Sequence, residues 1–215
     1  MYNGRVTVAG PADIRELPGL VISKLAVGPY DNNAYLLRCT ATGSSLLIDA
    51  AAEPQRLLDL VGDGSLDFVL TTHRHADHWQ ALAPVVEATG ARTVAGAVDS
   101  REIPVITTVR VNGGDTLAFG EISLKVFELT GHTDGSISVL YNDPTGHGHL
   151  FTGDCLFPGG IGRTLSDDGF DSLYEGVVRN FFTLHDETWV YPGHGHDTTI
   201  GAERPNLEEW LSRRW

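Results

Sequence analysis

Short apolar runs alternate with turn residues along most of the chain, and their periodicity predicts many strands and a few helices. In the first half we expect strands at Leu20–Val27, Asn33–Arg38, Ser44–Asp49 and Leu66–Thr72. In the second half we expect strands at Ala91–Ala95, Val105–Val111, Glu121–Leu129, Ser136–Tyr141, Gly148–Thr152 and Thr188–Tyr191. The β-branched and apolar content of Leu66–Thr72 indicates a strand that is buried on both faces.

Four other segments have helical character. Pro54–Leu60 begins with a proline at a first-turn position, where the missing N–H does no harm. Trp79–Thr89 is followed by Gly90, a residue typical of helix ends. Apolar residues recur at helical spacing within Phe170–Phe181, and Leu207–Leu211 predicts a short final helix. Two strand-rich halves with helices between them favour two packed sheets covered by helices, an α+β layered sandwich.

The length of 215 residues fits one domain better than two, so we expect residues 1–215 to form a single domain. The composition, with 41% hydrophobic and 20% charged residues, is that of a globular protein with a sizeable core. Residues 1–19 contain no apolar run typical of a signal peptide, and no stretch approaches the roughly 20 apolar residues of a membrane span. We therefore expect a cytoplasmic protein without a membrane partner.

The cysteine content bears on the compartment of the protein, and the net charge bears on its possible partners. The two cysteines, Cys39 and Cys155, are far apart and give no disulfide framework, which agrees with a reducing compartment. The formal net charge of −13 counts against DNA or RNA as a partner, because phosphate binding needs a basic surface. An anionic small substrate would need local positive charge from metal ions or a few arginines. The sequence gives no indication of an oligomeric state.

The strongest signal for chemistry is the segment Thr71-Thr72-His73-Arg74-His75-Ala76-Asp77-His78, between a buried strand and a predicted helix. An extended loop places residues i and i+2 on one side, so His73 and His75 can converge on one metal ion. Asp77 and His78, where the chain turns into the helix, can point at a second ion. The alternative of a helix N-cap explains Asp77 alone and leaves the three histidines without a role.

Three further candidates, His132, Asp154 and His194, each follow a glycine at the end of a predicted strand. Glycine lets the backbone turn sharply and brings the next side chain close to a bound ion. Each of these residues alone is typical of an ordinary turn. Their weight comes from the set, because together with the first motif they supply a full series of metal donors.

Several segments resemble the metallo-β-lactamase superfamily, and within it the small glyoxalase II-like hydrolases. Besides the first motif, the resemblance lies in Asp31–Leu36, Leu47–Asp49, Thr130–Thr133, Thr152–Asp154, Phe157–Thr164 and Tyr191–Gly195. The first and last motifs are specific for the superfamily, whereas the loop Phe157–Thr164 is more specific for the subgroup. The resemblance implies a four-layer αββα sandwich.

The resemblance also implies a site with two divalent metal ions. The implied ligands are His73, His75 and His132 for the first ion, Asp77, His78 and His194 for the second, and Asp154 between both. This donor set favours Zn²⁺, and iron or manganese would also fit it. The implied reaction is thioester hydrolysis by a bridging hydroxide, since metal binding lowers the pKa of water from 15.7 toward about 7. Asp77 and Asp154 are then the catalytic residues.

The glycine-rich loop provides the candidates for substrate binding, which are Phe157, Gly160 and Arg163. The resemblance places Arg163 where a basic residue contacts the anionic tail of a thiol substrate, although a surface salt bridge explains it equally well. Glyoxalase II continues after the last metal motif into a helical extension with glutathione contacts. Only about twenty residues follow His194, so we expect that extension to be missing, which counts against hydroxyacyl-glutathione as the natural substrate.

Other interpretations stay open at this stage. A persulfide dioxygenase with a single iron resembles the chain at the metal loop and at Gly162–Thr164, and a lactamase or another ester hydrolase could use the same fold. A binding module without turnover is disfavoured because every ligand position is filled. We interpret Cys155 as a small buried residue, and Trp79 as either a roof over the site or a core residue. The remaining histidines, expected to be non-catalytic, are His147, His149 and His196.

Overall fold

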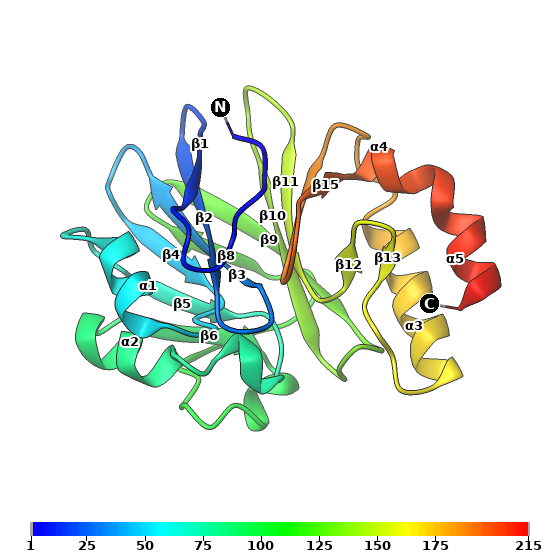
Figure 1. Cartoon of the computed structure of the whole chain (residues 1–215), viewed down its shortest axis with the longest axis horizontal. Helices are drawn as coiled ribbons and strands as arrows, with labels where there is room; N and C mark the ends of the chain where they lie inside the picture. Colours follow the sequence, from blue (N-terminus) through cyan, green and yellow to red (C-terminus); the bar gives the residue numbers. More distant parts are fainter. Residues whose placement is uncertain (1, 215) are drawn as a thin grey trace.

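Two β-sheets packed face to face form the centre of the computed structural model, which describes residues 2–214 (Figure 1). The first sheet has seven strands in sequential order. They are β1 (Asp13–Glu16), β2 (Leu20–Val27), β3 (Asn32–Cys39), β4 (Ser45–Ile48), β5 (Phe68–Thr71), β6 (Arg92–Gly96) and β7 (Val109–Val111). Strands β1 to β4 are antiparallel, and β4 to β7 are parallel. Parallel neighbours need crossover connections, which here include α1 (Pro54–Val61) and α2 (Leu82–Thr89).

The second sheet has six strands in the order β15-β14-β11-β10-β9-β8. They are β8 (Thr116–Phe119), β9 (Ile122–Leu129), β10 (Ser136–Asn142), β11 (Gly148–Gly153), β14 (Trp189–Pro192) and β15 (Thr198–Thr199). Strands β11 and β14 are parallel, and the connection between them contains α3 (Asp167–Asn180) and a small hairpin of β12 (Leu156–Phe157) and β13 (Gly160–Ile161). The chain then continues into α4 (Ile200–Glu203) and α5 (Leu207–Arg213).

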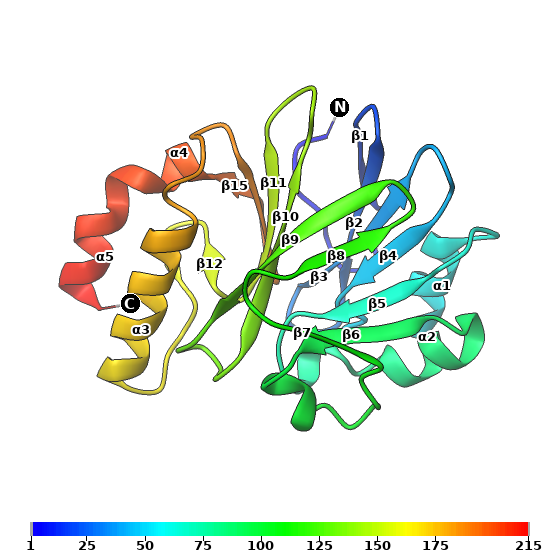
Figure 2. The same ribbon diagram turned by 180° about the vertical axis from the view of Figure 1, so that it is seen from behind.

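Three apolar cores hold four layers together. The central core lies between the sheets and includes Leu37, Phe151 and Tyr191. A second core packs α1 and α2 against the first sheet, and a third packs α3 and α5 against the second. Viewed from behind, the two helical layers flank the sheets on opposite sides (Figure 2). The predicted αββα sandwich is therefore confirmed.

Most predicted elements are present, with ends that differ by a few residues. The predicted strand Val105–Val111 is wrong in its first half, because β7 begins only at Val109. There, the Thr93 side chain bonds to the backbone of Ile106 and Thr108 in place of a regular ladder. The predicted helix Trp79–Thr89 begins only at Leu82, after a 3₁₀ turn at Ala76–His78. Six further elements are absent from the sequence-based prediction, namely β1, β8, β12, β13, β15 and α4.

No helix within residues 2–214 is long and apolar enough to cross a membrane. The predicted single domain, residues 1–215, includes Met1 and Trp215, which lie outside the described residues.

Candidate metal centre

The candidate ligands lie on four loops that follow strands of both sheets. The loop after β5 carries His73, His75, Asp77 and His78, the last two within the 3₁₀ turn. The loops after β9, β11 and β14 carry His132, Asp154 and His194, respectively. The fold therefore brings together seven side chains from four segments that are far apart in sequence.

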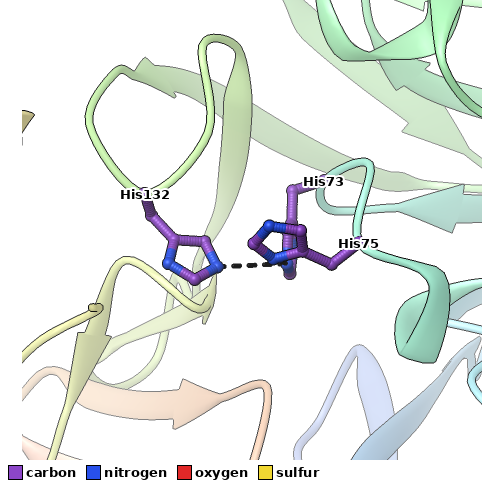
Figure 3. A group of neighbouring side chains, drawn as sticks. All are labelled: His73, His75 and His132. Atoms are coloured by element: carbon purple, nitrogen blue, oxygen red, sulfur yellow. Dashed lines mark hydrogen bonds between the residues drawn. The ribbon is translucent and has the colours of Figure 1, made fainter. Parts of the chain in front are cut away.

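The donor atoms form three overlapping groups among the described residues, each within 4.8 Å. The groups are His73, His75 and His132; His73, His78 and Asp154; and Asp77, His78 and His194. Figure 3 shows the rings of His73, His75 and His132 turned toward one another. One Asp154 oxygen lies 3.6 Å from Nε2 of His132 and 3.4 Å from Nε2 of His194, between the first group and the third.

Hydrogen bonds around the cluster assign the protonation of its histidines. Nδ1 of His132 donates to the carbonyl oxygen of Arg163 (2.8 Å), and Nδ1 of His194 donates to that of Tyr30 (2.7 Å). Nδ1 of His78 donates to the carboxylate of Asp49 (2.8 Å). Because these oxygens can only accept, each ring has a proton on Nδ1, and in its neutral form Nε2 faces inward with a free lone pair.

The inward nitrogen atoms approach one another closely. Nε2 of His73 lies 3.0 Å from Nδ1 of His75 and 3.3 Å from Nε2 of His132, and Nε2 of His78 lies 3.2 Å from Nε2 of His194. Lone pairs at these distances repel unless a proton or a metal ion lies between the two nitrogen atoms. Within residues 2–214, Oδ1 of Asp154 is buried without a hydrogen-bond partner. These residues therefore fit divalent metal ions.

The electrostatic environment keeps His73 neutral and Asp154 ionised. Burial lowers the pKa of His73 well below its usual range, and the neighbouring rings of His78 and His132 act in the same direction. Burial alone would raise the pKa of Asp154, but the adjacent rings of His78 and His194 bring it well below the ordinary value. At His78 and His194 burial alone would lower the pKa, but the Asp154 carboxylate raises it, so both rings favour the protonated form until a metal ion displaces the proton. A neutral imidazole and an ionised carboxylate are the ligand forms.

Two residues that support the cluster were missed by the sequence analysis. Asp49 accepts hydrogen bonds from His78 and from the backbone and hydroxyl of Thr72. Asn32 donates to Asp77 (3.0 Å). Partial burial would raise the pKa of Asp77, but the Asn32 bond and the nearby His78 keep it below its ordinary value. The segments Ile48-Asp49 and Asp31-Asn32, which contain these two residues, were the sequence signal that could have identified them.

The predicted substrate residues lie in the loop next to the cluster. The exposed Arg163 lines a cavity of about 360 Å³ together with Gly162, Thr164, Phe170 and Arg214. Because the Arg163 carbonyl accepts the hydrogen bond from His132, this cavity begins beside the first group of histidines.

The other two substrate candidates lie closer to the second group. The Phe157 ring centroid lies 6.3 Å from that of His194. Gly160 is buried and pairs with Phe157 in the β12–β13 hairpin.

The remaining residues singled out in the sequence have contacts of other kinds. Cys155 is buried, and burial raises the pKa of its thiol to about 12, which makes it unreactive. His149 is buried between Tyr141 and Tyr191, and His147 pairs with Glu187. Trp79 lies before α2, donates its indole N–H to the Arg74 carbonyl (2.8 Å) and packs against the second core. His196 lines a hollow near the first residues of the chain.

Comparison with known proteins gives one family. The model of the metallo-beta-lactamase superfamily matches residues 27–194. A hydroxyacylglutathione hydrolase of Rhodospirillum rubrum is 33% identical over 165 residues, which cover 76% of this chain and 62% of that protein. The chain spans about three fifths of the length of such relatives.

Solved structures agree with this match. ETHE1 from Myxococcus xanthus has a TM-score of 0.78 and 34% identity, covering 90% of this chain and 89% of that one. TTHA1623, solved in a di-iron-bound form, has a TM-score of 0.71 and 30% identity, covering 84% and 96%.

Proposed function

The chain belongs to the metallo-β-lactamase superfamily, and we propose that it is a dinuclear metal-dependent hydrolase of thioesters. The observation that carries this proposal is the ring of inward-facing nitrogen lone pairs on both sides of Asp154. Relatives named hydroxyacylglutathione hydrolase, at about 33% identity, supply the thioester part of the proposal.

The proposed reaction divides the work among the side chains. When bound, two divalent ions would lower the pKa of water and polarise a carbonyl oxygen. His73, His75 and His132 would hold one ion, Asp77, His78 and His194 the other, and Asp154 would contact both. The ionised Asp77, oriented by Asn32, would accept a hydrogen bond from the attacking water and align it.

The cavity beside His132 supports an anionic thiol carrier. Arg163 and Arg214 both line it, in a chain whose net charge of −13 would otherwise repel an anion. Arg214 pairs with Asp167 and Asp171, but these carboxylates are exposed and their ion pairs are weak. On the other side of the cluster, Tyr30, Gln80 and His194 line a hollow that we assign to the acyl group.

A thioester panel tests the proposal. The protein is reconstituted with Zn²⁺, Fe²⁺ or Mn²⁺ and assayed with acyl esters of anionic and uncharged thiols. We expect two metal ions per chain, metal-dependent release of free thiol, and the highest kcat/KM with an anionic thiol. Absence of hydrolysis across the panel, with two ions bound, would reject the thioester assignment. If the folded wild-type protein bound no metal ion, the proposed metal site as a whole would be rejected.

A second candidate is the mononuclear iron persulfide dioxygenase, which the likeness to ETHE1 at 34% identity favours. A complete third donor group, Asp77, His78 and His194, favours two ions instead. Metal content and oxygen uptake separate the two. One iron per chain with oxygen consumption on a persulfide would support the dioxygenase, and two ions with no oxygen uptake would support the hydrolase.

Zinc as the native metal, a cytoplasmic location and a single domain over residues 1–215 belong to the same proposal. Both cysteines are free and buried, which agrees with a reducing compartment.

A further inference from the structure

A buried carboxylate that contacts no candidate ligand connects two of the ligand loops. Asp99, on the 3₁₀ turn Asp99–Arg101 after β6, is fully buried. Its Oδ2 accepts hydrogen bonds from the backbone N–H of Arg74 (3.0 Å) and the hydroxyl of Thr133 (2.6 Å). Its Oδ1 accepts one from the backbone N–H of Gly135 (3.0 Å).

The donors to Asp99 lie next to candidate metal ligands on two different loops. Arg74 lies between His73 and His75, and Thr133 directly follows His132. One side chain therefore holds, by direct bonds, the backbone of both loops that present the first group of histidines. A buried carboxylate is costly unless its acceptors are satisfied, so the two loops and Asp99 hold one another in a single arrangement.

The surface contacts between the same loops are weaker. The Arg74 guanidinium pairs with Asp134 (2.7 Å) and Glu102 (2.9 Å), whose carboxylates are exposed, and lies 3.7 Å from Oδ1 of the buried Asp99. Exposed pairs of this kind contribute little. Asp49 supports another part of the cluster, because it bonds to His78 and to Thr72, whose hydroxyl lies 3.1 Å from Nδ1 of His73.

We propose that Asp99 is a positioning residue that sets the separation of His132 from His73 and His75, and so the metal affinity of that group alone. The inference rests on the proposed metal-binding role of these histidines. Asp99 acts through Arg74, Thr133 and Gly135 without touching an ion. Outer partners of metal ligands typically contribute about 10–100-fold in metal affinity.

The test is a metal titration of the full chain against a chromophoric chelator. The amide of Asp99→Asn cannot accept from all three donors, because its NH₂ group is itself a donor. We expect wild type to bind two Co²⁺ ions tightly, and Asp99→Asn to bind one tightly and the other about 10–100-fold more weakly. The Co²⁺ absorption spectrum of the variant should resemble that of His132→Ala and differ from that of His194→Ala.

A matched pair of variants keeps the inference testable if Asp99→Asn folds poorly. Thr133→Val removes one donor at nearly constant shape, whereas Thr133→Ser retains it. Thr133→Val should weaken the same ion, and Thr133→Ser should restore wild-type binding. Equal weakening of both ions, or two tight ions in both Asp99→Asn and Thr133→Val, would overturn the inference and leave the proposed function intact. A wild type that binds no metal would overturn both.

Discussion

A substitution at Gly193, which precedes His194, tests whether the position of the Asp154 carboxylate matters for activity and metal binding. A Cβ atom there would lie 2.2 Å from Oδ1 of Asp154 and 2.8 Å from Cε1 of His78, whereas ordinary contacts begin at 3.4 Å. The loop cannot retreat easily, because the Gly193 N–H donates to Gly153 (2.8 Å) and its carbonyl accepts from Asn33 (2.7 Å). In Gly193→Ala the Asp154 carboxylate must therefore move by about 1 Å.

A displacement of that size has a known order of magnitude. Misplacing a reacting group by about 1 Å costs roughly 100-fold in rate, or about 2.7 kcal/mol of transition-state stabilisation. We expect Gly193→Ala to lose roughly 100-fold in kcat/KM for the best thioester of the panel, together with part of its bound metal. Steady-state kinetics and elemental analysis of the purified protein measure both effects.

Gly195→Ala is the matched control in the same loop. Gly195 has a positive φ of 70° but open space around its Cβ position. Alanine there costs about 1–2 kcal/mol of backbone strain without a clash, so stability should fall while metal content is retained. Wild-type kinetics and two bound ions in Gly193→Ala would refute the steric reasoning. An equal loss of metal in both variants would attribute the effect to the loop as a whole.

Three further predictions concern other residues. Asp154→Ala should lose metal and reduce activity by orders of magnitude, whereas His149→Ala should stay within a few-fold; equal losses would contradict the ligand assignment. Arg163→Ala should raise KM for anionic thioesters by at least about tenfold, from the loss of a charge-assisted hydrogen bond of ~1.5–3 kcal/mol. An unchanged KM for anionic and uncharged substrates alike would make Arg163 a structural residue. Burial lowers the pKa of His149 from 6.5 to about 4, so the unfolded chain takes up its proton first as the pH falls. The contribution of neutral His149 to the free energy of unfolding is fully present above pH 6.5. It is lost as the pH falls toward 4, by up to ~3 kcal/mol. Denaturant unfolding of metal-free wild type and His149→Gln should show the steeper acid loss in wild type, and parallel pH profiles would argue against it.

The sequence predicts what depends on local pattern. Strand β2 matches its predicted bounds, and the donors of the first motif follow a buried strand as expected, because both depend on neighbouring residues. Long-range partners lie beyond such patterns. Asp99 looks like an ordinary loop aspartate until the fold brings the His132 loop beside it.

The same limit explains the errors in helix and strand boundaries. Trp79 has the apolar character of a helix residue, yet its hydrogen bond to Arg74 holds it outside α2. The start of β7 is set by Thr93, more than ten positions earlier in the chain. Periodicity contains no information on either contact.

The division of the donors between the two sheets has a consequence for folding. The loop after β5 supplies four side chains, and loops of the other sheet supply three. Ions held in this way would have to be released before the halves could separate, so binding would oppose unfolding by RT ln(1 + [M]/Kd). At a free metal concentration of 100 Kd, that amounts to about 2.7 kcal/mol for one ion. Metal starvation would then expose the chain to proteolysis, so that the supply of metal governs the abundance of the protein as well as its turnover.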